Sequence, residues 1–549
     1  MLKTMTGQVK NRSYVLVSVL LIDAASIAIA AEPIAFEDVT ESSGLGAVFE
    51  RMPGRRPWRY AHGAAWGDVD GDGRPDLFAG AFAGRKWFTG EDSPVPNLLL
   101  LNRPDGFVRA DAEPLEMRAA NSRCAGAAFF DLDNDGDLDL VVTNHVQKAD
   151  HGGSRIFENL GTGRWRDVTP ESAPWTSQLG MRNVSALDVN HDGRLDLILC
   201  DGSYGKGAEQ RAKLWVLVNR GGWKFDDASE SLGLPQGNVH GLGLAVGDIN
   251  NDGTFDLFVA GCNRLFVSDK QGQYVEAHPG RFQVPVADVK EGMHCGAAFG
   301  DLNGDGLLDL VTTEHGVPAR MHVFVTSSIV NGIPDLREVS DAVGLAGTLP
   351  PGTRELPFKT AHVTLRDMDN DGRIDIVTTL IATSDSGIPQ PVVLRNTRDA
   401  VSRLKFSAIP TDRLVTYYAP GPVADFDRDG RVDLFLPSWF EPVPNRLFRN
   451  TTRGGHWLTV RVVGSGTANT QGIGAIVRAY AAGHLGDPSH LLGRADIAVG
   501  TGYASGEEAL AHLGLGPATR CDLRIQWLTQ TIDRTNLAVD QFVTVPVAR

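Results

Sequence analysis

Short apolar runs alternate with polar turns along most of the chain, and they recur in a fixed order. Runs such as GAAWGD, GAAFFD, GLAVGD and GAAFGD lead into an acidic turn, and runs such as LDLVVTN and FDLFVAG follow it. A third apolar run comes next, for example NLLLLN at 97–102 and LWVLVNR at 214–220. Apolar runs of this length bounded by turn residues are typical of β-strands. The pattern therefore predicts an all-β fold.

A fourth phrase closes most units and gives a clue to how the units are joined. It reads WRDVTPES at 165, FDDASESLGL at 225 and LREVSDAVGL at 336. The seventh unit stops after LFRNTT at 447–452, whereas a matching phrase, FEDVTESSGL, stands at 36–45 before the first unit. We expect this N-terminal segment to add the outer strand of the seventh unit, which closes a ring and removes a free strand edge. A solenoid is the alternative, and the displaced phrase favours the ring.

The acidic turn occurs seven times, with starts 53 to 66 residues apart, at Asp68, Asp131, Asp188, Asp248, Asp301, Asp367 and Asp425. Position 1 is always Asp, position 3 is Asp or Asn, position 5 is Asp, position 6 is Gly and position 9 is Asp. A period near 60 residues with several strands in each unit is typical of propeller blades. We therefore predict a seven-bladed β-propeller.

The spacing of oxygen donors in these turns predicts a calcium site in each. Ca²⁺ takes six to eight oxygen ligands at about 2.3–2.6 Å, and side chains at positions 1, 3, 5 and 9 can converge on one ion. The variable residue at position 7 can still offer its backbone carbonyl, and glycine at position 6 permits the sharp turn. The start of the loop is similar to an EF-hand, but the closing acid stands at position 9 and strands flank the loop.

We therefore expect up to seven Ca²⁺ ions, with the following residues as ligands: Asp68, Asp70, Asp72, Arg74 and Asp76; Asp131, Asp133, Asp135, Asp137 and Asp139; Asp188, Asn190, Asp192, Arg194 and Asp196; Asp248, Asn250, Asp252, Thr254 and Asp256; Asp301, Asn303, Asp305, Leu307 and Asp309; Asp367, Asp369, Asp371, Arg373 and Asp375; Asp425, Asp427, Asp429, Arg431 and Asp433.

Charge supports a cation requirement and excludes one class of partner. The chain has 67 acidic and 52 basic residues and a formal net charge of −15. Acidic side chains this close together repel one another unless a cation lies between them, so calcium is expected to stabilise the fold. Nucleic-acid binding needs a basic surface and is not expected.

The N-terminus has the pattern of an export signal. Lys3, Lys10 and Arg12 precede the apolar run YVLVSVLLI at 14–22, and Ala28-Ile-Ala30 offers a small-residue cleavage site. We expect a signal peptide over residues 1–30 and a secreted, periplasmic or cell-surface protein. A buried strand or an uncleaved anchor is the alternative. No later segment has about 20 uninterrupted apolar residues, so no membrane span is expected after signal removal.

The repeats resemble FG-GAP/VCBS repeats, the calcium-loop blades of integrin α-subunit propellers, and this propeller region is placed at 31–453. Residues 454–549 lack acidic loops but contain WLTVRVVG, NTQGIGAIVRAYA and HLGLG, which predict a small β-rich domain. They resemble the ASPIC/UnbV domain of the cartilage acidic protein family and its bacterial relatives. WLTQTIDR at 527–534 departs from the Trp-Pro-Ser-Gly turn of that domain. The resemblance implies interaction outside the cell or at its surface.

Histidines at strand ends suggest a second candidate site. In each unit, the start of the first strand and the end of the second share the end opposite the acidic loop. The residues there are His62, His240, His294, His362, His145, Glu314 and His315. They could line the mouth of a central channel and bind a transition metal or transfer protons. Their offsets from the loops differ in parity, so strand alternation would point half of them away, and scattered packing histidines are the alternative.

No G-x-S-x-G, HExxH or phosphate-binding loop is present. Glu508 and His512 could share one face of a helical turn, or lie on a solvated surface. Long loops carry Trp87, Tyr204 and Trp439, which suit contacts with a protein or carbohydrate ligand. We expect a monomeric binding scaffold that acts through the face opposite the calcium loops. An enzyme that uses the channel-mouth histidines is the alternative.

Overall fold

The computed structural model describes residues 33–50, 61–82, 95–111, 114–119, 122–145, 153–161, 163–169, 180–202, 208–282, 293–315, 321–345, 360–380, 392–398, 404–408, 421–438, 445–466 and 468–548. The chain divides into two compact units, Met1–Glu32 and Pro33–Arg549, and the second contains all the described residues. The predicted signal peptide and the loop residues Trp87, Tyr204 and Trp439 lie outside them.

Four consecutive strands pair in antiparallel order in each of six sheets, and in the first of them β32 (Ser505–Gly506) adds a fifth strand in parallel beside β2. Their strands are β2 (Ala61–Gly67), β3 (Asp76–Ala81), β4 (Leu98–Arg103) and β5 (Gly106–Arg109); β6 (Cys124–Phe130), β7 (Asp139–Asn144), β8 (Arg155–Asn159) and β9 (Trp165–Asp167); β10 (Met181–Leu187), β11 (Asp196–Asp201), β12 (Leu214–Asn219) and β13 (Phe225–Asp227); β14 (Gly241–Gly247), β15 (Asp256–Gly261), β16 (Arg264–Ser268) and β17 (Tyr274–Ala277); β18 (Met293–Gly300), β19 (Asp309–His315), β20 (Met321–Val330) and β21 (Ile333–Glu338); β22 (Thr360–Arg366), β23 (Asp375–Leu380), β24 (Val392–Asn396) and β25 (Phe406–Ala408). The all-β, propeller-like prediction is confirmed.

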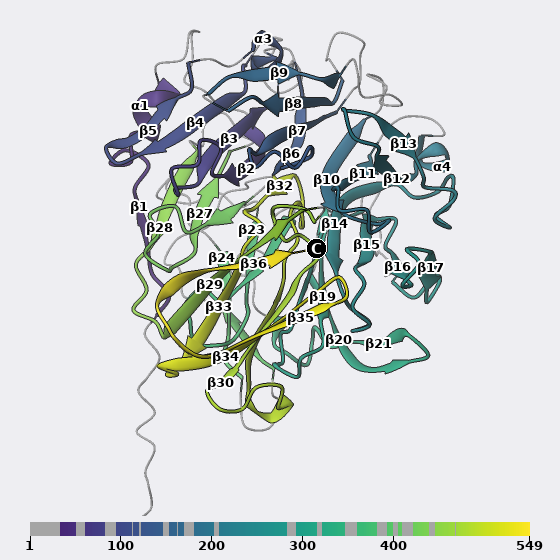
Figure 1. Ribbon diagram of the computed structural model, residues 1–549, viewed down its shortest axis with the longest axis vertical. Coiled ribbons are helices and arrows are strands. Elements are labelled where there is room, and N and C mark those ends of the chain that lie inside the picture. Colours follow the sequence, from purple (N-terminus) through teal and green to yellow (C-terminus); the bar gives the residue numbers. More distant parts are fainter. Residues whose placement is uncertain are drawn as a thin grey trace, which may run out of the picture. The chain divides into compact units, whose positions relative to one another are not determined.

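A seventh sheet combines the two ends of this region. It contains β26 (Val423–Ala424), β27 (Asp433–Leu436), β28 (Arg446–Asn450) and the N-terminal strand β1 (Phe36–Asp38). Strand β1 pairs with β28 in antiparallel register, with Phe36 opposite Asn450 and Asp38 opposite Phe448. Figure 1 shows β1, in purple, beside β28, in green. The prediction that the N-terminal segment completes this sheet is confirmed.

Apolar side chains bind each sheet to the next. The first strands β2, β6, β10, β14, β18 and β22 contact one another in this order. Trp66 of β2 packs with Phe435 of β27, their ring centroids 6.3 Å apart, and so joins the first sheet to the seventh. Val377 of β23 packs in one cluster with Leu434 of β27, and so joins the sixth to the seventh. Fully buried strands of this kind read as continuous apolar runs, as the sequence does.

Short helices lie in the connections between strands: α1 (Leu45–Glu50) between β1 and β2, α3 (Leu115–Arg118) between β5 and β6, and α4 (Ala208–Arg211) between β11 and β12. None of the helices in the described residues has the length and apolar character needed to cross a membrane.

Two further sheets form the C-terminal region. One has the order β33-β29-β36, from β29 (His456–Ser465), β33 (Ala511–Gly516) and β36 (Gln541–Ala548). The other has the order β31-β30-β34-β35, from β30 (Ile476–Ala481), β31 (Leu491–Asp496), β34 (Arg520–Trp527) and β35 (Gln530–Ala538), and a short helix, η5 (Pro488–His490), precedes β31. The divergent WLTQTIDR stretch makes a two-residue hairpin turn, in which Trp527 pairs with Gln530 and Leu528 has a φ of +55°.

Candidate functional site

The seven acidic loops have one geometry, and each joins the first strand of a sheet to the second. The Asp at position 1 accepts a hydrogen bond of 2.7–3.0 Å from the amide of the glycine at position 6 in every loop. That glycine has a φ between +84° and +100° in all seven, a conformation that side chains disfavour. This explains why glycine recurs at position 6 and shows that the seven loops share one backbone conformation there.

The Asp at position 9 is the first residue of the second strand and is at most 1 % exposed in all seven loops. One oxygen accepts from the amide at position 2, and the other accepts from an amide of the third strand, at 2.7–3.1 Å. In the second loop, for example, Asp139 binds the amides of Leu132 and Asn159. Each of these carboxylates therefore fixes the loop to the third strand and still has lone pairs for a cation.

The donor sets fit a hard cation. Carboxylate oxygens of Asp68, Asp70 and Asp76 lie within 4.8 Å of one another, as do those of Asp131, Asp133 and Asp139 and those of Asp367, Asp369 and Asp371. Oδ1 of Asp68 and Oδ1 of Asp369 are buried without a hydrogen-bond partner among the described residues. Buried carboxylate oxygens need a partner, and oxygen-only donor sets suit Ca²⁺.

Burial and mutual repulsion change the acidity of these groups. Burial raises the pKa of Asp76 and of Asp196 to about 8, and neighbouring carboxylates add to the rise. The pKa of Asp425 rises to about 7 for the same reasons. Burial also raises the pKa of Asp139 and of Asp309 well above the ordinary value. A divalent cation would favour the charged form of each group.

Two groups of side chains that contact the backbone around these loops were not anticipated from the sequence. Where position 7 is arginine, its guanidinium pairs with the Asp at position 5 and its Nε donates to a carbonyl of the third strand, as in Arg194, which contacts Asp192 and Asn219. The same carbonyl bond occurs at Arg74, Arg373 and Arg431. The sequence does contain a signal for this group. Arginine recurs at position 7, although we expected the side chain at that position to be free to vary.

The second group consists of asparagines in the third strands that bind the acidic loop of the preceding sheet. Asn159 donates its side-chain amide to the carbonyl of Val69, and Asn219 does the same to Leu132, each at 2.8 Å. Bonds of the same length join Asn396 to Leu302, Asn450 to Met368 and Asn102 to Phe426. The last bond joins the first sheet to the seventh.

The C-terminal sheets pack directly on the acidic loops. Thr470 donates its hydroxyl to Asp131 of the second loop, and Gln471 accepts from the amide of that aspartate at 2.8 Å. Arg494, which is 3 % exposed, donates to the carbonyls of Asp248 and Gly306 at 2.9 Å each. Two predicted calcium loops, the fourth and the fifth, are therefore joined by one buried side chain of the C-terminal region.

Residues 499–507, here called the central segment, run between the first strands of the sheets. Strand β32 (Ser505–Gly506) pairs in parallel with β2, and Gly502 makes backbone bonds to Leu244 of β14 and Ala297 of β18. Ser185 of β10 donates its hydroxyl to the carbonyl of Val499. The space that we expected to be a central channel with a histidine-lined mouth is thus occupied by the chain itself.

Glutamates at the end of this segment are paired. Glu507 contacts the guanidinium of Arg366, and Glu508 binds Arg428 through two bonds of 2.7 and 3.0 Å. Residues around them form β32 and β33, so the suggestion of a helical turn that aligns Glu508 with His512 is wrong. Both glutamates are largely buried, so the alternative of a solvated surface is wrong as well.

The predicted histidines are distributed over several places. His62 lies 3.0 Å from the hydroxyl of Tyr503, and His362 accepts from the amide of Tyr503 at 3.2 Å. Burial lowers the pKa of His362 to about 4, so the ring is neutral near pH 7. These two histidines therefore bind the central segment.

His145 stacks on Phe82, which also contacts His62. His240 immediately precedes β14 and is 8 % exposed. The side chain of His315 lies outside the described residues. Among the predicted residues whose side chains the structure describes, His294 and Glu314 come together with a third potential ligand, His322, which the sequence did not single out.

Comparison with known proteins agrees with this organisation. The FG-GAP-like repeat model matches residues 68–142 and 131–199, and the model named ASPIC and UnbV matches residues 464–548. Cartilage acidic protein 1 of Xenopus tropicalis is 24 % identical over 495 residues, which cover 86 % of this chain and 71 % of that protein. The Homo sapiens protein of the same name is 24 % identical over 494 residues, which cover 86 % and 69 %.

Solved structures are more distant. A rhamnogalacturonan lyase aligns with a TM-score of 0.38 at 14 % identity, covering 72 % of each chain. The Dos1 propeller aligns with a TM-score of 0.36 at 9 % identity, covering 72 % of this chain and 87 % of that one. Similarities this weak carry no argument about what the chain does.

Proposed function

We propose that this chain, which carries FG-GAP-like repeats and an ASPIC and UnbV domain, is an exported calcium-binding propeller that serves as a scaffold for binding another molecule. The carrying observation is that all seven acidic loops hold a buried aspartate at position 9 that two backbone amides fix, and that carboxylate oxygens converge within 4.8 Å in the first, second and sixth loops. Oxygen donors that are already in place bind a cation without the free-energy cost of rearranging the loop. The bound ion then stabilises the folded chain.

In this proposal, the seven sheets are the seven blades of one closed ring. Residues 31–453 form the ring, and residues 454–549 form the C-terminal domain. The order of contacts between first strands and the bond from Asn102 to Phe426 support closure. The structural role of calcium is then to hold one end of each blade, where the C-terminal domain packs.

The partner surface is proposed at the sheet ends opposite the acidic loops. Thr470 and Arg494 bring the C-terminal domain onto the loops, and the central segment occupies the space between the first strands. Both observations favour the opposite ends as the surface on which loops can contact a protein or carbohydrate partner. The lysines and apolar run at 3–22 support export.

Calcium stoichiometry and export test this function. The full chain, expressed with a C-terminal tag, is expected outside the cytoplasm with a mature N-terminus near Ala31. Equilibrium dialysis should find close to seven Ca²⁺ ions, and the double variant Asp131→Asn, Asp133→Asn should lose one. The matched control is Asp226→Asn, which changes an exposed aspartate outside the loops and should keep all of them.

Retention of the uncleaved chain in the cytoplasm, or a chain that binds no calcium, would overturn the proposal. The scaffold role itself is tested on a glycan and protein array. A partner should bind the calcium-loaded chain and be released by chelator.

A further inference from the structure

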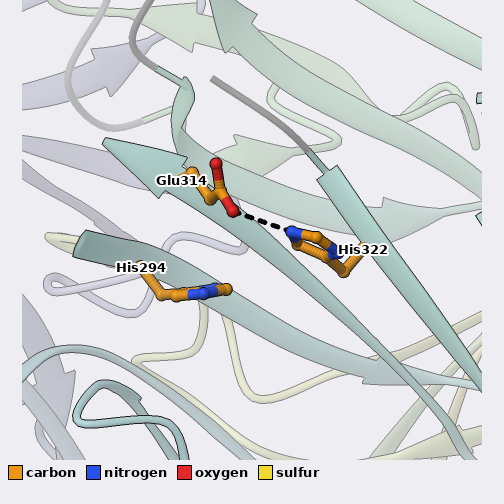
Figure 2. Close-up of side chains that lie close together, drawn as sticks. All are labelled: His294, Glu314 and His322. Carbon is orange, nitrogen blue, oxygen red and sulfur yellow. Dashed lines mark hydrogen bonds and ion pairs between the residues drawn. The ribbon is translucent and has the colours of Figure 1, made fainter. Parts of the chain in front are cut away.

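Three neighbouring strands of the fifth sheet bring two imidazoles and a carboxylate together. His294 is the second residue of β18, Glu314 the next to last of β19 and His322 the second of β20. His294 and Glu314 are direct cross-strand partners, and His322 is opposite Thr312, two residues from Glu314. Residues that pair directly or alternate along a strand share one face of the sheet. Figure 2 shows the three side chains directed toward one another.

The distances suit a single metal ion. Nε2 of His322 and Oε1 of Glu314 are 2.8 Å apart, and the ring centroids of His294 and His322 are 5.5 Å apart. One donor atom from each residue can be chosen so that all three lie within 4.8 Å of one another. Ligands bonded to Zn²⁺ at about 2.0–2.1 Å in a tetrahedron lie about 3.4 Å apart. Small side-chain rotations would therefore complete the site.

His294 supplies the independent evidence for a ligand. Its side chain is 3 % exposed, and neither ring nitrogen has a hydrogen-bond partner among the described residues. A buried polar group without a partner destabilises a fold, so such groups are rare and call for an explanation. The hydrogen bond between Glu314 and His322 does not involve His294, so it does not explain why the ring of His294 is buried without a hydrogen-bond partner. A metal ion bound to all three residues does.

A second carboxylate supports the orientation of His322. Oε1 of Glu338, on β21, lies 3.7 Å from Nδ1 of His322, while Nε2 faces Glu314. A metal-bound histidine usually has its second ring nitrogen next to a carboxylate or carbonyl, which fixes the ring.

We propose that His294, Glu314 and His322 bind one transition-metal ion of the zinc class, separately from the calcium loops. Two imidazoles and one carboxylate are donors that Zn²⁺ accepts and Ca²⁺ does not favour. The site lies seven residues from Asp301 along β18, which is about 23 Å at about 3.3 Å per residue. Three protein ligands leave a fourth position for water or a substrate group, as in catalytic zinc sites.

Metal titration of the full chain in excess calcium tests the proposal. The chelated and calcium-reloaded protein is expected to bind one further Zn²⁺ with high affinity. Co²⁺ in its place should give a visible absorption band of nitrogen-ligated cobalt, and X-ray absorption at the zinc edge should show imidazole ligands. A wild-type chain that binds no Zn²⁺ in excess calcium, or binds it through oxygen only, overturns the proposal without any variant.

Variants identify the residues. His294→Ala should weaken Zn²⁺ binding by more than about 100-fold, since changes to residues that merely orient ligands already cost about 10–100-fold. Glu314→Gln keeps the shape of the side chain, removes its charge and should act in the same direction if the alanine variant fails to fold. The control is His484→Ala, which alters a more exposed group formed with Asp487 and His490. Zinc binding that is lost in the control and kept in Glu314→Gln would overturn the assignment.

Discussion

The side chain of Asn102 in the first sheet donates a 2.8 Å hydrogen bond to the carbonyl of Phe426 in the seventh, 324 residues further along the chain. Four other third-strand asparagines make the same bond to the acidic loop of the preceding sheet. In the fourth and fifth sheets, Ser268 and Thr326 replace asparagine and bond within their own sheet. Each asparagine therefore joins one repeat to its neighbour, and Asn102 makes this bond across the closure of the series.

Replacing Asn102 with alanine should destabilise the chain by about 1–3 kcal/mol, because the partly buried carbonyl of Phe426 loses its hydrogen-bond partner. Urea unfolding at fixed calcium measures the change in the free energy of unfolding. Gln271→Ala, at an exposed side chain of the fourth sheet, should change stability by less than about 0.5 kcal/mol. Equal stabilities of the two variants would contradict the role given to Asn102.

Removal of calcium should lower the melting temperature. A single site filled at 100 times its dissociation constant adds about 2.7 kcal/mol of stability, so even one loop should shift the midpoint by several degrees. Differential scanning calorimetry with chelator, and again after calcium is restored, gives the measurement. Magnesium should restore less, because it requires a smaller octahedral site. An identical melt with and without chelator would count against calcium in the loops.

The chelated chain should become less stable as the pH rises. Burial raises the pKa of Asp76 and Asp196 to about 8, whereas an unfolded aspartate has a pKa of about 3.9. Between these values the folded chain binds more protons than the unfolded chain, so stability is present at low pH and is lost as the pH rises through the folded pKa.

The melting temperature in chelator should therefore be lower at about pH 8 than at about pH 5. Bound calcium keeps these groups charged and should remove this trend. A melting temperature that rises over the same interval in chelator would exclude the explanation.

Arg494→Leu should be among the most damaging changes to the C-terminal domain. Its guanidinium is buried, binds Asp496 at 2.8 Å and reaches the fourth and fifth acidic loops. Removing one partner of a buried pair leaves an uncompensated charge and costs about 3–5 kcal/mol. Limited proteolysis should release the C-terminal domain earlier.

Arg524→Leu is the matched control, since Arg524 pairs with Asp533 where both side chains are about one-third exposed. An exposed pair of this kind contributes at most about 1 kcal/mol. Equal protease sensitivity of the two variants would contradict the proposed role of Arg494.

Repetition made the sheets predictable from the sequence. Each repeat contains the same acidic turn between its first two strands, and the N-terminal strand could be assigned because FEDVTESSGL matches the phrase missing after residue 452. The positions of the seven loops were predictable for the same reason, and the assignment of their oxygens to calcium stays a prediction.

The histidine cluster was only partly predictable. His294 and Glu314 stand at strand ends. Their pairing, however, depends on a register irregularity between His294 and Ala297, which the local sequence does not predict. His322 stands inside the run MHVFVTSSIV, which reads as an ordinary strand.

The position of the central segment follows from tertiary contacts. A side chain at Gly500 would come within 1.8 Å of the carbonyl oxygen of Val184, and one at Gly502 within 2.7 Å of His362. The glycines of VGTGYASG therefore reflect close approach to the first strands, whereas the sequence alone suggests only turns.

Strand β1 has a consequence for the order of events during synthesis. Glu37 of β1 pairs with Arg449 of β28, and the two residues are 412 residues apart. At about 5–20 residues per second, the ribosome therefore adds Arg449 about 20–80 s after Glu37. During that interval β28 does not yet exist, and β1 remains an unpaired edge strand. The central segment is made later still. A chaperone or a translocation channel that shields residues 36–38 would protect this strand during that interval, and the seventh sheet would be completed only after β28 emerges.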